Sequence, residues 1–266
     1  MNRREFAIRF GSAVVGSMAQ RSWPLQHGAH AAMDHSVDQA NYTLHITPMT
    51  LDLGGRISIR TVGYNRSVPG PVLRLKEGVP TVIEVFNHSD TAELVHWHGL
   101  AIDSVSDGAM EEGAPMISPQ GRLRYSFTPK PAGTRWYHTH ASAGTDLSRS
   151  TYTGQFGFLI VENTNEAEDY DREVLLAVHH WEPTLMPMGP GQPCEVSYKY
   201  ASFNDKVLSA AEPIKVRRCE RVLFRFLNAS ATENVVLALP GHRFKVIALD
   251  GNPVPYPKEV SVLSDR

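Results

Sequence analysis

Two short motifs in this 266-residue chain repeat a histidine at alternate positions. Residues 95–99 read Val-His-Trp-His-Gly, and residues 136–140 read Trp-Tyr-His-Thr-His. In an extended strand successive side chains point to opposite faces, so the two histidines of each motif share one face. If the two strands lie side by side, four imidazoles converge on one small volume. The histidines of this candidate metal site are His96, His98, His138 and His140.

The donor set narrows the choice of metal. Neutral imidazoles bind copper, zinc, iron and nickel, and an all-nitrogen set without a nearby carboxylate or thiolate favours copper or zinc. The sequence contains neither His-Glu-x-x-His nor Cys-x-x-Cys, which are common signatures of zinc sites. Histidines of a single His-x-His are often ordinary surface or core residues of a sheet. Two copies in the same predicted sandwich favour a metal site. His179 and His180 are adjacent, point to opposite faces of a strand, and are predicted to be structural.

The elements that must position these histidines are predicted to be β-strands. From about residue 41, short runs rich in β-branched and aromatic residues alternate with turn residues. The first series of expected strands is Asn41–Thr47, Arg56–Tyr64, Thr81–Asn87, Glu93–His98, Leu123–Thr128, Thr134–His140 and Phe156–Glu162. The second series is Glu173–His180, Val196–Phe203, Ile214–Arg217, Arg221–Asn228, Asn234–Leu239, Arg243–Leu249 and Glu259–Leu263. Regularly spaced short strands predict an all-β fold with two sandwiches in tandem, over residues 40–163 and 172–266.

Composition and charge exclude several classes of protein. Hydrophobic residues make up 42% of the chain and charged residues 20%, which are the values of a globular protein. The formal net charge of −2 and the absence of a long basic run give no electrostatic basis for binding nucleic acid. No stretch is apolar over the length needed to cross a bilayer, so no transmembrane segment is expected.

Residues 1–39 are predicted to be a leader peptide followed by a histidine-containing linker. A charged pair precedes the weakly apolar stretch 7–19, and the segment resembles a twin-arginine signal through Arg3, Arg4 and Phe6. The alternative is an uncleaved basic terminus. Export implies a periplasmic or other extracytoplasmic, oxidising compartment. The linker histidines are expected to be solvated, with loose copper binding as the alternative; they are His27, His30 and His35.

Beyond the paired histidines, several longer stretches carry a resemblance to the multicopper oxidases, in particular to bacterial laccase-like members. They are His96-Trp-His-Gly-Leu100, Ser106-Asp-Gly108, Pro131-Ala-Gly-Thr-Arg-Trp-Tyr-His-Thr-His140, Gly154-Gln-Phe-Gly-Phe158, Leu227-Asn-Ala-Ser230 and Leu239-Pro-Gly-His-Arg-Phe244. The resemblance implies tandem cupredoxin-like (plastocyanin-like) Greek-key sandwiches. It also implies copper as the cofactor, O₂ as the electron acceptor and a small reductant as the substrate.

Residue by residue, the resemblance implies a role for each histidine of the paired motifs. His96 would bind the type 2 copper, and His98, His138 and His140 would bind the type 3 pair. Asp107 matches a family position that relays protons beside the copper cluster, and a turn-forming role before Gly108 is the alternative. Side chains at alternate positions, Trp97 and Tyr137, should face away from the cluster and pack in the core.

Other family motifs do not occur in the sequence. Complete members supply the remaining cluster ligands from a later His-x-His and join the cluster to a type 1 copper through His-Cys-His. Neither Cys194 nor Cys219 is flanked by histidine, although the two could pair as a disulfide, and His242 has no partner histidine. We therefore expect the N-terminal portion of such an oxidase, truncated, frameshifted or split, with an incomplete second sandwich.

Three hypotheses follow for the function. The first is a laccase-like oxidoreductase lineage, with a chain that binds copper but is inactive alone, because the electron-entry site is missing. It would need a complementary C-terminal fragment or would self-associate through an unpaired strand edge. The second is a non-catalytic extracytoplasmic copper carrier. The third is a structural protein on the same fold, which the retained histidines disfavour.

Overall fold

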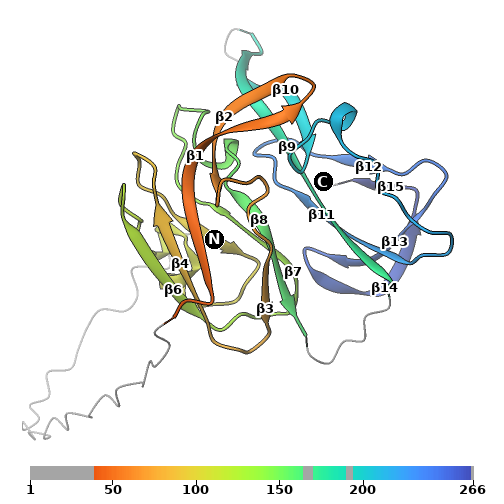
Figure 1. Ribbon diagram of the computed structural model, residues 1–266, viewed down its shortest axis with the longest axis horizontal. Helices are drawn as coiled ribbons and strands as arrows, with labels where there is room; N and C mark the ends of the chain where they lie inside the picture. The colour runs from red at the N-terminus through yellow and green to blue at the C-terminus, as the bar shows by residue number, and fades with distance from the viewer. Residues whose placement is uncertain (1–38, 164–169, 190–193, 265–266) are drawn as a thin grey trace, which may run out of the picture. The chain divides into compact units, whose positions relative to one another are not determined.

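The computed structural model describes residues 39–163, 170–189 and 194–264 (Figure 1). The predicted leader, with its arginine pair and its linker histidines, lies outside the described residues. In the part of the chain that is described, no helix has the length and apolar character required to traverse a lipid bilayer. The regular secondary structure of the described residues is almost entirely β-strand, as the sequence predicts.

The two histidine motifs lie in a sandwich of two four-stranded sheets. The first sheet has the order β2-β1-β4-β6 and the second the order β3-β8-β7-β5. The strands of the first sheet are β1 (Tyr42–Gly54), β2 (Ile57–Tyr64), β4 (Thr81–Asn87) and β6 (Arg122–Phe127). Those of the second are β3 (Leu73–Lys76), β5 (Val95–His98), β7 (Gly133–Thr139) and β8 (Phe156–Glu162).

The inward faces of the two sheets form one hydrophobic core. Alternate residues of β1 and β4, such as Leu44 and Ile83, are completely buried there. From the opposite sheet, Trp97 and Tyr137 enter the same core, and both side chains are fully buried. The prediction that these two aromatic residues pack away from the histidines is therefore confirmed. Their burial is what turns the histidines to the other face of the second sheet.

The second half of the chain adds three smaller sheets. One has the order β10-β9-β11, and the other two are the pairs β12-β15 and β13-β14. The strands are β9 (Arg172–Pro187), β10 (Cys194–Phe203), β11 (Val222–Asn228), β12 (Val236–Ala238), β13 (Phe244–Leu249), β14 (Asn252–Val260) and β15 (Val262–Ser264). The partition into 40–163 and 172–266 stays a prediction.

Strand β8 connects the two halves because both of its faces are buried. Leu159 and Val161 point into the core of the sandwich, whereas Phe156, Phe158 and Ile160 belong to a second cluster. That second cluster also includes Trp181 of β9 and Leu227 of β11. A strand covered on both sides needs a continuous apolar run, which explains the sequence Phe-Gly-Phe-Leu-Ile-Val.

Short helical segments complete the described structure. The only α-helix in these ranges, α1 (Ser104–Asp107), follows β5. Three 3-10 turns are η1 (Met110–Glu112), η2 (Ser150–Tyr152) and η3 (Leu208–Ala210). Between β7 and η2, residues 140–149 form turns and loop.

Candidate metal centre

The pairing of β5 with β7 brings the two histidine motifs together. The strands are antiparallel, and His96 lies opposite His138 while His98 lies opposite Trp136. Because side chains alternate along both strands, these four residues share the face that points away from the hydrophobic core. His140 follows the last residue of β7, and its backbone N–H donates to the carbonyl of Leu94 at 3.1 Å. The predicted convergence of the two motifs is thus present in the structure.

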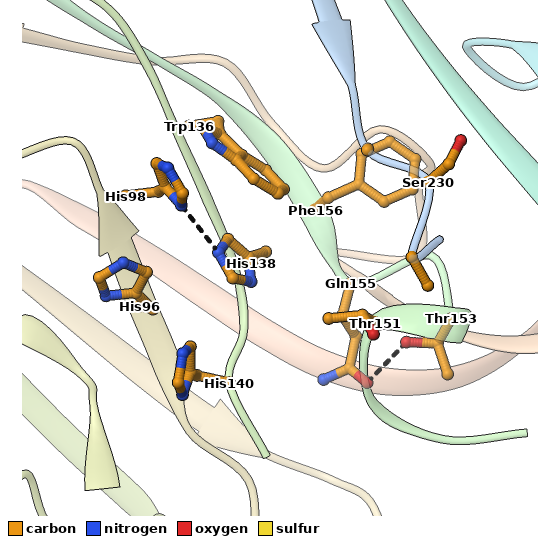
Figure 2. Close-up of a pocket in the computed structure, with 12 residues that line it drawn as sticks. His96, His98, Trp136, His138, His140, Thr151, Thr153, Gln155, Phe156 and Ser230 are labelled. Carbon is orange, nitrogen blue, oxygen red and sulfur yellow. Dashed lines mark hydrogen bonds between the residues drawn. The ribbon is translucent and has the colours of Figure 1, made fainter. Parts of the chain in front are cut away.

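The imidazole rings are close enough to share a metal ion. One nitrogen from each of His96, His98 and His138 lies within 4.8 Å of the other two. His140 is slightly further out, with its ring centre 5.3 Å from that of His96 and 6.0 Å from that of His138. Figure 2 shows the four rings gathered on one side of the cavity. The structure therefore forms a tight group of three histidines with the fourth beside it.

Backbone carbonyls fix the proton of two of these rings. A carbonyl oxygen only accepts, so the Nδ1–H of His96 donates to the carbonyl of Asp107 at 2.8 Å. The Nδ1–H of His138 likewise donates to the carbonyl of Thr139 at 2.8 Å. Each ring is left with the lone pair of Nε2 for another partner. For His138 that partner is Nδ1 of His98, at 3.3 Å. Such contacts orient imidazoles for metal binding.

The electrostatic surroundings favour the neutral form of two rings, those of His138 and His98. Burial is the main cause that lowers the pKa of His138, to about 3, and the neighbouring histidines lower it further. Burial also lowers the pKa of His98, with the ring of His96 as the next cause. An unprotonated imidazole has a free lone pair, so these two side chains are suited to hold a cation at neutral pH. Trp136 stacks on His138, with ring centres 4.1 Å apart.

The histidines form one wall of a cavity of about 280 Å³. Figure 2 shows Phe156 and Ser230 on the opposite side, with Gln155 and Thr153 at the base of the view. The lining residues that the sequence analysis did not identify are Trp136, Thr151, Thr153, Gln155, Phe156, Ala229, Ser230 and Ala231. Trp136 carried a geometric signal, because it precedes His138 by two positions and therefore shares its face. Four further lining residues lie within the stretches that carry the family resemblance, namely Gln155, Phe156, Ala229 and Ser230.

His179 and His180, which the sequence predicts to be structural, hold part of that opposite wall. His179 is fully buried and donates from Nδ1 to the carbonyl of Ala229 at 2.7 Å. His180 contacts the hydroxyl of Ser230 through Nδ1 at 2.7 Å. Neither residue lines the cavity itself. Their structural role is to anchor the segment 229–231 that covers the histidines.

Asp107 lies next to the paired motifs. Its carboxylate oxygen Oδ2 is 3.3 Å from Nδ1 of His96, and its side chain is 16% exposed. Gly108 ends α1 with a φ of 80°, a conformation that favours glycine. A Cβ at this position would lie 1.8 Å from the carbonyl oxygen of Val95, on the strand that carries His96. The Asp-Gly pair thus makes the turn and brings the carboxylate to the histidine.

Other candidate ligands lie apart from the group. Cys194 and Cys219 are free and exposed, so the disulfide considered above is not formed in the structure. His242 is exposed and contacts the carbonyl of Pro240. Glu111 is 70% exposed, with its carboxylate 3.9 Å from Nδ1 of His140. Among the described residues, the only group of three or more potential ligands consists of His96, His98 and His138.

The donor set fits copper better than the hard divalent ions, because all of its members are imidazole nitrogens. Two models of one family, described as multicopper oxidase, match residues 45–166 and 134–264. Together they span residues 45–264, which include the whole histidine group. The chain belongs to the multicopper oxidase family. Membership of this family implies copper as the metal.

Curated multicopper oxidases and solved structures share this similarity. The multicopper oxidase MmcO of Mycobacterium tuberculosis is 30% identical over 88% of this chain and 51% of its own length. Copper resistance protein A of Escherichia coli is 25% identical over 91% of this chain and 48% of its own length. The chain thus spans about half the length of these curated relatives.

Two solved structures illustrate the likeness of fold. Lac15 from a marine microbial metagenome has a TM-score of 0.68 and 30% identity, over 85% of this chain and 57% of its own. The blue copper oxidase of Nitrosomonas europaea has a TM-score of 0.73 and 24% identity, over 84% of this chain and 71% of its own. The second similarity concerns the fold alone. The prediction of an all-β, cupredoxin-like architecture is confirmed.

Proposed function

We propose that this chain provides half of the copper cluster of a laccase-like multicopper oxidase. His96 is assigned to the type 2 copper, and His98, His138 and His140 to the type 3 pair. The observation that carries the proposal is the in-register pairing of β5 and β7, which places His96 opposite His138 and gathers three imidazole nitrogens within 4.8 Å. Copper bound there supplies the one-electron redox chemistry that reduction of O₂ requires.

The surrounding residues are suited to orient the ligands and to limit access of water. The carbonyls of Asp107 and Thr139 hold the Nδ1 protons of two rings, which leaves Nε2 of each ring available. Trp136 and Phe156 supply apolar surface around the rings. Asp107 is assigned to proton transfer, and its support is the contact of 3.3 Å between Oδ2 and Nδ1 of His96.

The overall reaction assigned to the whole protein is oxidation of a small reductant coupled to four-electron reduction of O₂ to water. The printed sequence has no His-Cys-His, so this part of the protein is proposed to be inactive alone and to need a fragment that carries the missing ligands. The chemical class of the reductant stays open between phenols, metal ions and other small donors.

A second candidate is a copper-binding or copper-carrier protein without oxidase activity. It is favoured by one observation: all four imidazoles come from a single sandwich and need no other chain to meet. The similarity to a protein named copper resistance protein A agrees with copper handling in either case. For both candidates we propose export by the twin-arginine route, which the pair Arg3 and Arg4 supports.

The proposal predicts that copper binding depends on both histidine strands. Replacing His98 and His140 with alanine leaves one imidazole on each strand, and we expect copper stoichiometry or affinity to fall sharply. Alanine at His180, a residue that does not itself line the cavity, is the control and should retain binding. The measurement is a competition titration of purified chain with Cu²⁺, followed by metal analysis. Equal copper content in the two variants would contradict the assignment.

A further inference from the structure

A buried carboxylate lies directly in front of the first histidine strand. Glu93 is 5% exposed and precedes β5 by two positions. Burial raises the pKa of this carboxyl, and hydrogen bonds from Gln155 and Thr139 oppose that effect. Placing a carboxylate in the protein interior is costly unless donors compensate it. The positions of the two donors, Gln155 and Thr139, therefore indicate the structural role of the Glu93 carboxylate.

Glu93 accepts one hydrogen bond from each of two other segments. The hydroxyl of Thr139 donates to its Oε2 at 3.0 Å, and the side-chain amide of Gln155 donates to the same oxygen at 2.9 Å. The other end of Gln155 is held as well, since Oε1 accepts from the hydroxyl of Thr153 at 2.9 Å. We call Glu93, Thr139 and Gln155 the carboxylate clasp. All three side chains are at most 5% exposed.

The clasp lies where three strands of the ligand-bearing sheet begin or end. Thr139 is the last residue of β7 and separates His138 from His140. Gln155 directly precedes β8 and lines the histidine cavity. Its backbone carbonyl accepts a hydrogen bond from the backbone N–H of Thr139 at 3.0 Å. Glu93 leads into β5, which is only four residues long. The carboxylate thus joins the strand that carries one histidine pair to the strand that carries the other.

The hydrogen bond between Thr139 and Glu93 matters because the ladder between β5 and β7 is short. The pairing of β5 with β7 covers only four residue pairs, from Val95 with Thr139 to His98 with Trp136. A shift of either strand by one residue would turn its histidines to the opposite face. Thr139 belongs to the end pair of this ladder, and its hydrogen bond to Glu93 reaches two residues beyond Val95 on the other strand. This bond therefore opposes such a shift. The backbone of Glu93 is itself fixed by two hydrogen bonds with Ile117.

We propose that Glu93 is a positioning residue of the copper centre, which sets the register of the two histidine motifs through Thr139 and Gln155. The inference rests on the proposed copper-binding function of the four histidines. The side-chain hydrogen bonds of Glu93 go to Thr139 and Gln155 rather than to the histidines. Its role is to accept from both donors with one oxygen, so an amide oxygen at the same place should serve as well, whereas an apolar side chain should not.

The test compares Glu93→Leu, Glu93→Gln and Thr139→Val in the full chain. For Glu93→Leu and Thr139→Val we expect Cu²⁺ affinity to fall by about 10–100-fold, the usual effect of losing a residue that supports metal ligands, together with an altered EPR spectrum of bound Cu²⁺. Glu93→Gln should bind nearly as tightly as wild type. In the double variant Glu93→Leu with Thr139→Val, the two losses should be less than additive, because both variants remove the hydrogen bond from Thr139 to Glu93.

Ser202→Ala is the matched control. Ser202, like Thr139, is a fully buried hydroxyl residue, and it accepts from the indole N–H of Trp181 at 2.8 Å in the second half of the chain. It should lower the melting temperature of the metal-free protein to a similar extent and leave Cu²⁺ affinity unchanged. If Glu93→Leu does not fold, the nearly isosteric Thr139→Val still decides the question.

The outcomes separate the two proposals. If wild type binds no Cu²⁺, the proposed function is wrong and the role of Glu93 falls with it. If wild type binds Cu²⁺ and Thr139→Val keeps the affinity and EPR spectrum of wild type, the inference alone is overturned. It is also overturned if Ser202→Ala weakens binding as much as Thr139→Val, because the effect would then reflect general destabilisation.

Discussion

At the scale of residues, backbone carbonyls orient two of the four histidine rings, those of His96 and His138. His-x-His in a strand requires a shared face, and the burial of Trp97 and Tyr137 confirms that reading. The proton acceptors of His96 and His138 are backbone carbonyls, which every residue carries and which leave no trace in a sequence. The clasp residue Glu93 was equally hidden, because a glutamate before a strand is ordinary.

A pH-dependent loss of stability is expected from His179. Burial lowers the pKa of His179 to about 4. Hydrogen bonds to the carbonyls of Ala229 and Tyr152 favour the protonated form and oppose this effect. The unfolded chain binds this proton more readily, so the contribution is present above pH 6.5 and is lost as the pH falls towards 4. The two pKa values correspond to about 3 kcal/mol.

The measurement is the free energy of unfolding of metal-free protein in urea at pH 7 and at pH 4. Since other buried groups also titrate, the comparison is with His179→Phe, which keeps an aromatic ring against Phe156 and Trp181. Wild type should lose about 3 kcal/mol more than the variant between the two pH values. Parallel pH profiles would show that His179 is not the group responsible.

At the scale of elements, strands with regular alternation or continuous apolar runs were predictable. The expected bounds of β4 and β8 agree with the structure residue for residue. Strand β14 was largely missed because it contains Pro253, Pro255 and Pro257, and proline is unfavourable in a ladder except at an edge. Strand β3 has only four residues, too few for a pattern. The strand expected at Ile214–Arg217 is wrong, since these residues form no ladder.

The turn at Gly108 gives a prediction about how α1 is attached to β5. Gly108→Ala introduces a Cβ at a φ of 80° and 1.8 Å from the carbonyl oxygen of Val95. Gly78→Ala is the control, because Gly78 has a φ of 73° and no atom within 4 Å of its added Cβ. The control should cost about 1 kcal/mol for backbone conformation alone.

Gly108→Ala should cost distinctly more in free energy of unfolding, because the backbone must move to relieve the clash. We also expect weaker Cu²⁺ binding, since that movement takes Asp107 away from Nδ1 of His96. Chemical denaturation and copper titration measure the two effects. Similar stability of the two alanine variants would mean that the helix end tolerates displacement.

At the scale of the whole molecule, the two halves are joined by packing and by ion pairs. The outer face of β8 packs on Trp181 and Leu227 in one buried cluster. Glu173 of β9 accepts from Arg225 at 2.5 Å and also pairs with Arg74 of the first sandwich. By contrast, the far strands of the second half expose large apolar residues, such as Tyr256 at 83% and Val236 at 66%. The sequence predicted several strands of this half but not their contacts with β8.

The ligand inventory of the chain predicts its spectroscopy and its activity. Intense blue absorption arises from a copper–thiolate bond with histidine co-ligands, and the two cysteines, Cys194 and Cys219, are exposed and free. The copper-loaded chain should therefore lack an intense blue band and show no sustained consumption of O₂ with a phenolic reductant. Absorption spectroscopy and an oxygen electrode provide the measurements.

Activity should appear when a fragment that carries the later His-x-His and His-Cys-His motifs is supplied. The same fragment with alanine in place of its cysteine is the control and should restore neither colour nor turnover. Robust oxidase activity of the chain by itself, with copper as the only addition, would overturn the assignment as half of a cluster.

The residues that line the histidine cavity come from stretches that are far apart in the sequence, so they are synthesised at different times. All four imidazoles lie between His96 and His140, and their sheet is complete once β8 has emerged. The cover, residues 229–231, is synthesised later, as are the two histidines of β9 that anchor it. Synthesis of the ligand wall is therefore complete before synthesis of its cover begins, so the cavity can take its full shape only after residues 229–231 have been added.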